Sequence, residues 1–136
     1  MITSKSTPPA RFQASLVPVL QKIRTVYIFW YSVFHTIQKP HRYTLAPKID
    51  TLFIEIIEMV ASASFVKKTD KIIYLRTAIR KLDTLKILLN ILWETRSLDN
   101  QKYELLSLPL DEIGRMLGGW LGQVEKQNSP ADAGEK

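Results

Sequence analysis

Three basic residues within residues 70–96 have the spacing that a rigid phosphate-binding strip requires. If this segment is helical, with 100° between successive residues, Arg76, Arg80 and Lys86 fall on one polar stripe. Cations repeated along one helix face suit the phosphates of a nucleic-acid backbone. Asp83 lies three residues from both Arg80 and Lys86, so a surface charge ladder explains the stripe equally well. The stripe alone leaves both interpretations open.

Further basic residues extend this candidate nucleic-acid surface. They lie along the first predicted helix, at its far end and around the second predicted turn: Lys22, Arg24, Lys39, Arg42, Lys67, Lys68 and Lys71. The formal net charge is +6, and every charged residue before Asp50 is basic, so positive potential gathers in the N-terminal third. This distribution favours a long polyanion over a small phosphorylated metabolite. A solvated basic surface without a ligand is the alternative.

The carboxylates and histidines show no catalytic or metal-binding pattern. The chain has no cysteine, and His35 and His41 stand six residues apart rather than at the four-residue spacing of a helical metal site. Glu55 and Glu58 are three apart but lack the histidine partners of a four-helix di-iron site. We therefore predict a protein that is not an enzyme and holds no metal or cofactor. A metal-binding bundle using Glu55, Glu58 and His35 is the weaker alternative.

Four amphipathic helices are expected to position these residues, over residues 15–38, 44–64, 70–96 and 100–125. Short turns make successive helices antiparallel, which predicts an all-α, up-down four-helix bundle. Pro109 should kink or break the last helix. The expected N-terminal caps of the third and fourth helices are Thr69 or Asp70, and Asp99 or Asn100.

The first helix carries more apolar surface than one neighbouring helix could cover. Its residues 26–34 are apolar almost all round the axis, so we expect a second subunit to cover Trp30 and Phe34, or close helix packing to bury them. Exposed aromatic rings could instead stack nucleic-acid bases. Helical spacing favours packing for the aromatic residues of this region, which are Tyr27, Trp30, Tyr31, Phe34 and Tyr43.

The last helix contains an unusual run of glycines. Gly114, Gly118 and Gly122 are spaced by four, and each costs about 0.8–1 kcal/mol of helix propensity relative to alanine. A compensating contact is expected, either a closely packed helix or an oligomer interface beside Trp120. A phosphate-binding loop is excluded because no strand precedes the glycines and no Gly-Lys-Ser or Gly-Lys-Thr follows them.

The chain of 136 residues is expected to hold one domain. We predict a flexible arm over residues 1–14, the bundle over residues 15–126 and a disordered tail over residues 127–136. The longest apolar stretch is far short of the ~20 residues that span a bilayer. Residues 1–14 are polar and contain proline, which is not the pattern expected of a secretory signal. We therefore expect a cytoplasmic protein without a membrane partner.

Two segments resemble a group of bacterial four-helix bundle proteins. They are residues 70–92 (DKIIYLRTAIRKLDTLKILLNIL) and residues 111–121 (DEIGRMLGGWL), the latter with a glycine-tryptophan helix end. The group includes the ribosomal-RNA intervening-sequence proteins and the accessory variability determinants of diversity-generating retroelements. The resemblance covers most of the chain.

The resemblance implies a four-helix protomer that assembles into a ring-like homo-oligomer, a pentamer. For the retroelement branch it implies a non-catalytic accessory protein that binds RNA, or DNA, and a reverse transcriptase that copies a template repeat with errors. The alternative is a stand-alone member of the intervening-sequence branch, an oligomeric binding protein without a polymerase partner. Related accessory proteins carry basic residues in the third helix, which favours nucleic acid for the stripe there. Asn90 departs from that basic pattern.

Overall fold

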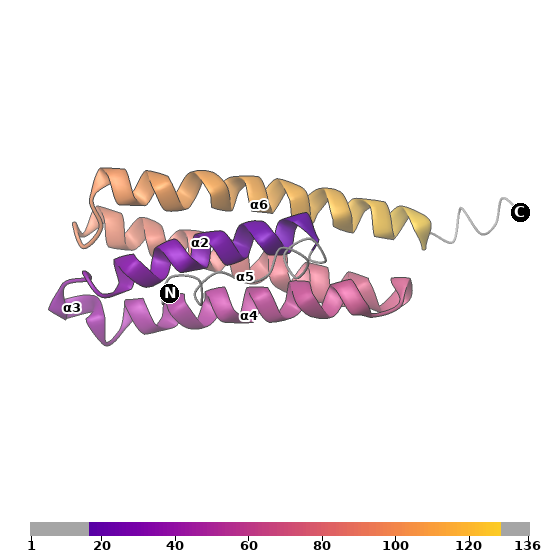
Figure 1. Ribbon diagram of the computed structural model, residues 1–136, viewed down its shortest axis with the longest axis horizontal. Coiled ribbons are helices and arrows are strands. Elements are labelled where there is room, and N and C mark those ends of the chain that lie inside the picture. Colours follow the sequence, from indigo (N-terminus) through magenta and orange to yellow (C-terminus); the bar gives the residue numbers. More distant parts are fainter. Residues whose placement is uncertain (1–16, 129–136) are drawn as a thin grey trace, which may run out of the picture.

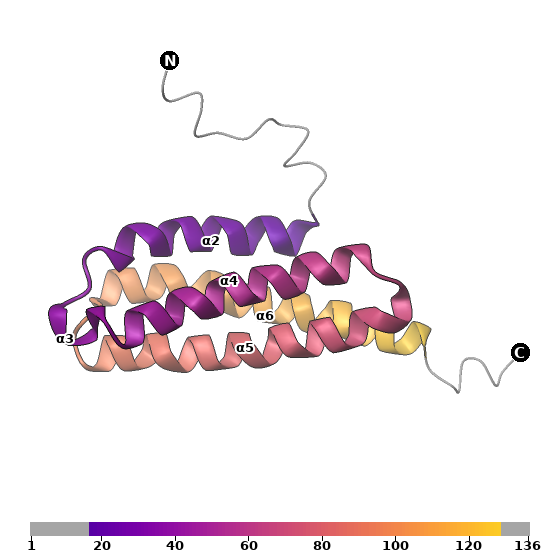
Figure 2. The same cartoon turned by 90° about the horizontal axis from the view of Figure 1, so that it is seen from below.

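The computed structural model describes residues 17–128, which form an all-helical bundle (Figure 1). Each long helix packs against two others, in the order α2, α4, α5, α6 and back to α2 (Figure 2). Successive long helices run in opposite directions, so the predicted up-down architecture is confirmed for the described residues. In chain order the helices there are α2 (Pro18–Phe34), α3 (Lys39–Arg42), α4 (Leu45–Phe65), α5 (Lys68–Glu94) and α6 (Asn100–Gln127).

The predicted arm over residues 1–14 lies outside the described residues, as do residues 129–136 of the predicted tail. The first two residues of that tail belong to the end of α6, as its last residue Gln127 and its C-cap Asn128. No helix among residues 17–128 is long and apolar enough to cross a membrane.

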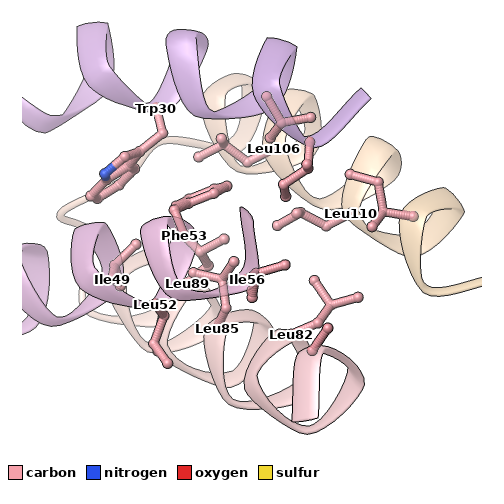
Figure 3. Close-up of a cluster of buried hydrophobic side chains, with 14 of the residues drawn as sticks. Trp30, Ile49, Leu52, Phe53, Ile56, Leu82, Leu85, Leu89, Leu106 and Leu110 are labelled. Atoms are coloured by element: carbon pink, nitrogen blue, oxygen red, sulfur yellow. The ribbon is translucent and has the colours of Figure 1, made fainter. Parts of the chain in front are cut away.

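Hydrophobic side chains alone make up the core between the long helices (Figure 3). Among the described residues, no polar or charged residue is buried. Trp30 of α2 is fully buried and stacks on Phe53 of α4, with ring centroids 6.0 Å apart. Burying side chains of this size is worth about 1.5–3 kcal/mol each. Burial of this core therefore supplies most of the free energy that holds the four long helices together.

A polar contact at the edge of the core fixes α2 against α4. Tyr27 donates its hydroxyl proton to Asp50 Oδ1 at 2.9 Å, and Trp30 Nε1 donates to the same oxygen at 3.2 Å. Partial burial, together with the hydrogen bond and negative charge of Asp50, raises the pKa of Tyr27 from 10.0 to about 12. Tyr27 therefore stays protonated and keeps donating to Asp50 well above neutral pH.

The first predicted helix ends earlier than expected. Helix α2 stops at Phe34, and the chain then turns so that Ile37 is fully buried. Arg42 of α3 holds this turn by donating from Nε and Nη2 to the Ile37 carbonyl oxygen, at 3.4 and 3.3 Å. Pro40 lies in the first turn of α3, where its missing N–H is tolerated.

The connection from α4 to α5 is tighter than predicted, because only residues 66–67 separate the two helices. The predicted caps Thr69 and Asp70 were wrong, since both residues lie inside the first turn of α5 and the N-cap is Lys67. Lys71 stabilises the end of α4 instead, because its ammonium group donates to the Ala63 carbonyl at 2.5 Å.

Helix α6 begins as predicted but is not interrupted. Asp99 is its N-cap, and Oδ1 accepts from the Lys102 amide at 2.8 Å. Of the kink or break predicted at Pro109, the break was wrong, since α6 continues through this residue. The proline leaves the carbonyl of Leu105 without its helical donor, but Leu105 is half exposed, so water can reach that carbonyl.

The end of α5 adopts a Schellman motif with an arginine in the position that usually holds glycine. The Ser97 amide donates to the Leu92 carbonyl at 2.8 Å, and the Arg96 amide donates to the Trp93 carbonyl at 3.0 Å. Arg96 has φ of 66°, in the left-handed region that is unfavourable for a residue with a Cβ atom. The turn into α6 therefore stores local strain at Arg96.

Candidate nucleic-acid interface

Three of the predicted nucleic-acid-binding cations are ion-paired between helices. The ammonium of Lys22 in α2 lies 3.2 Å from Glu112 in α6, and that of Lys86 in α5 lies 2.9 Å from Asp111 in α6. Arg76 of α5 pairs with Glu125 of α6. These pairs are partly exposed, and such pairs stabilise a protein by only about 0–1 kcal/mol. A phosphate can therefore compete with the carboxylates at little expense in stability.

Lys86 does not form the charge ladder within α5 that its sequence spacing allowed. Its partner Asp111 lies on the neighbouring helix, whereas Asp83 on the same helix has no ion pair among the described residues. Asn90, which departs from the basic pattern, donates from Nδ2 to the Tyr103 hydroxyl of α6 at 3.3 Å. Asn90 and Lys86 thus tie α5 to α6 on the same side of the bundle.

Two other predicted cations are used inside the fold. Arg42 binds the Ile37 carbonyl, and Lys71 binds the Ala63 carbonyl while its ammonium lies 5.9 Å from the centre of the Trp120 ring. Both side chains therefore stabilise turns, at opposite ends of the bundle (Figure 1).

The remaining five predicted cations have no ion pair or side-chain hydrogen bond within residues 17–128. Lys39 lies at the end of the bundle that carries α3, and Lys67 and Lys68 lie at the opposite end. Arg80 is exposed midway along α5, and Arg24 is half-buried on α2. The structure therefore spreads its free cations along the bundle and does not gather them in one pocket.

Sequence reasoning missed the exposed apolar residues beside these cations. Phe65 is 84% exposed next to Lys67 and Lys68. Ile73 and Ile87 are also exposed on α5, and they lie on the same outer face as Arg80. Three-and-four spacing identifies only the buried stripe of a helix. Apolar residues outside that stripe therefore carry no sequence signal that they are exposed.

Close packing inside the protomer, the first predicted reason for the glycines of α6, is not found. A Cβ atom at Gly118 or Gly122 would meet no other atom within 4 Å. A Cβ atom at Gly114 would lie 3.5 Å from Leu82, an ordinary van der Waals distance. Nearby Trp120 is partly buried against the core. The glycine face is thus open in the protomer at Gly118 and Gly122.

The aromatic residues of the first predicted helix divide into two groups. Trp30 is fully buried, and Phe34 packs against it with ring centroids 5.9 Å apart, so both serve helix packing in the protomer. Tyr27 also packs, edge-on to Phe53. Tyr31 is exposed, as is Tyr43 beyond that helix. Of the expected second apolar surface, only Ile28 and Tyr31 are exposed within residues 26–34.

No group of three or more histidine, aspartate or glutamate side chains in the described part of the chain could hold a metal ion. Of the residues considered for a metal site, Glu55 pairs with Lys81 at 3.0 Å and His35 packs edge-on against Tyr31. The other histidine, His41, lies with Nδ1 2.7 Å from Ser97 Oγ, where it joins α3 to the α5–α6 turn.

One open cavity of about 560 Å³ lies at the α5–α6 turn. Glu94, Arg96 and Asp99 line it together with Trp93, Leu98 and Asn100. Its charged groups are two carboxylates and one guanidinium. This lining lacks a nucleophile paired with a base, so it does not form the constellation of an acyl- or phosphoryl-transfer site.

Together these observations describe a small all-α bundle protein with free cations spread over its exterior. The family model described as bAvd-like matches residues 17–124, and the chain therefore belongs to this family, the bacterial accessory variability determinants. The family is accessory and non-catalytic in name, and it implies association with components of diversity-generating retroelements. Comparison with curated proteins gives no match.

Proposed function

We propose that the protein is a non-catalytic accessory factor of a diversity-generating retroelement, acting in the cytoplasm. It binds template RNA, and DNA more generally, through its basic exterior, and it binds the cognate reverse transcriptase to support mutagenic copying. Family membership supports the accessory role. The five free cations, spread from one end of the bundle to the other, are the observation that carries nucleic-acid binding.

A homo-oligomer is part of the proposal, with a pentameric ring as the expected form. The exposed side chains Ile28 and Tyr31 on α2 and the open glycine face of α6 supply surface for subunit contacts. Each free cation contributes little to binding alone. Several copies in one ring raise the effective concentration of phosphate-binding groups along a single RNA, so the combined affinity becomes large.

Fluorescence anisotropy with a labelled structured RNA, and with DNA of matching sequence, tests nucleic-acid binding. We expect micromolar or tighter affinity that weakens steeply with salt. Lys67→Gln/Lys68→Gln should reduce the slope of log K against log salt by about 1.4 for each protomer in contact with a single strand. Lys48→Gln/Lys102→Gln, with the same change of charge outside the candidate surface, is the control. Equal slopes for both variants, or no binding at low salt, would contradict the proposal.

Co-purification tests the polymerase partner. The tagged protein is expressed together with the cognate reverse transcriptase and purified in the presence of nuclease. The enzyme should stay bound to it through purification. Nuclease treatment separates a direct protein contact from two proteins held on one RNA. Reproducible absence of a complex, with and without nuclease, would rule out the accessory role as proposed.

A further inference from the structure

Phe65 is the most exposed large hydrophobic side chain among the described residues, at 84%. It is the last residue of α4, at the end of the bundle where the chain turns into α5 (Figure 1). Its ring forms no aromatic contact within residues 17–128. A large flat apolar surface is therefore presented to the solvent at one tip of the molecule.

The turn that carries Phe65 is held in a defined shape. Lys71 donates to the Ala63 carbonyl at 2.5 Å, two residues before the phenylalanine. Asn128 at the end of α6 donates from Nδ2 to the Lys68 carbonyl at 3.0 Å. These contacts fix the turn on both sides, so a ligand that binds there loses little of its affinity to ordering the backbone.

The charge around the ring fits an anionic ligand. Lys67 lies in the turn and Lys68 begins α5; both are exposed, and neither ammonium group has a partner among the described residues. The one acidic neighbour within five residues, Asp70, leaves an excess of positive charge. A flat ring close in sequence to free cations is the combination with which proteins bind single-stranded nucleic acids, since bases stack on the ring and lysines contact the adjacent phosphates.

We propose that the Phe65 turn, residues 65–68, binds an unpaired nucleobase, with Phe65 stacking on the base and Lys67 and Lys68 contacting the flanking phosphates. This inference rests on the proposed function and adds that the preferred ligand has unpaired bases, in a loop, an end or a single strand. A continuous duplex hides the base faces in its own stack, so its bases cannot reach the ring.

Two other classes of partner fit the turn less well. A membrane surface is bound by a wide apolar helix face, whereas Phe65 is followed by the exposed polar residues Lys67, Lys68, Thr69 and Asp70. A protein interface requires a contiguous apolar patch, but the polar segment separates Phe65 from Ile73, the next strongly exposed apolar residue. A single base on a single ring needs no larger patch.

The experiment compares two labelled 15-nucleotide strands, oligouridylate and an abasic strand with the same phosphates. We expect the full-length protein to bind oligouridylate more tightly than the abasic strand. Phe65→Ala should weaken oligouridylate binding by about 5- to 150-fold and leave abasic binding unchanged. Phe65→Leu, which keeps the bulk without the ring, should behave like Phe65→Ala, and Phe65→Trp should restore affinity. Leu108→Ala is the control, an exposed apolar residue with no lysine or arginine within four residues.

The outcomes separate this inference from the proposed function. Binding of neither strand by the wild type would overturn both. Equal affinity of the wild type for both strands, with no effect of Phe65→Ala, would overturn only the base-stacking inference. Equal loss on both strands, or a smaller oligomer for Phe65→Ala in light scattering, would assign Phe65 to assembly. Loss of binding to anionic vesicles with RNA binding unchanged would assign it to a membrane surface.

Discussion

Replacing the open glycines of α6 with alanine tests directly what this face is for. A Cβ atom at Gly118 or Gly122 enters empty space in the protomer, so the substitution introduces no clash. Each alanine removes the helix-propensity penalty of glycine, about 0.8–1 kcal/mol. Gly118→Ala/Gly122→Ala should therefore raise the free energy of unfolding of the protomer by about 1.6–2 kcal/mol. The two stability changes should add, because the two added methyl groups have no contacting residue in common.

If the same face lies against a second subunit, the added methyl groups must lower the oligomer affinity. We expect both effects together, a more stable protomer and a smaller oligomer. Urea unfolding at low protein concentration measures the first effect, and light scattering over a concentration series measures the second. Gly114→Ala is the matched control, because its Cβ atom would make an ordinary 3.5 Å contact with Leu82 inside the protomer. It should change stability without changing the oligomer.

Two results would refute this reasoning. A lower free energy of unfolding for the double variant would mean that a contact inside the protomer needs the glycines. An unchanged oligomer together with higher stability would mean that the face is not an interface, and the reason for the glycines would then lie elsewhere.

Three further predictions concern the turns and the edge of the core. Arg96→Gly should raise the free energy of unfolding by about 0.5–1 kcal/mol in urea titration, because glycine adopts the observed φ of 66° without strain. Asp99→Ala should lower it by about 1 kcal/mol, because the Lys102 amide loses its cap, and unchanged helicity and stability would argue against the cap. The raised pKa of Tyr27 means that its hydrogen bond stabilises the fold fully below pH 10, and that this stability is lost as the pH rises from 10 to about 12. Tyr27→Phe should remove that alkaline loss in melting curves recorded from pH 8 to 12, and an identical pH dependence would contradict it.

The core stripe of α4 was predictable because residues spaced by the helical period lie on one face of the helix and are buried together. Ile49, Phe53, Ile56 and Val60 follow one another at steps of four, three and four residues, and all four are fully buried. On α5 the same four-residue step leads from Leu89 to Trp93, yet Trp93 is only partly buried and Leu92 takes the core position. Ile73, Ile87 and Ile91 are apolar residues of α5 outside its core face, so the sequence pattern alone does not determine how the helix is rotated about its axis.

The partners of the cations could not be predicted, because they depend on which helices become neighbours. Lys22 and Glu112 belong to opposite ends of the sequence and meet only once α2 lies beside α6. Arg76 and Glu125 meet only because α5 and α6 are antiparallel. Local spacing favours ion pairs between residues three or four apart, so it predicted Asp83 as the partner of Lys86. It missed Asp111, which lies on the neighbouring helix α6.

The purely apolar core has a consequence for how the helices find their register. Apolar side chains attract one another without direction, so a slip of α2 by one turn along α4 still places apolar groups on apolar groups. The same slip would carry the Tyr27 hydroxyl and the Trp30 indole about 5.4 Å away from Asp50 and leave both donors unpaired. A single carboxylate at the rim therefore selects one alignment among several that the core would accept. Sequences that keep this carboxylate and its two donors can vary the interior widely and still align the helices in the same way.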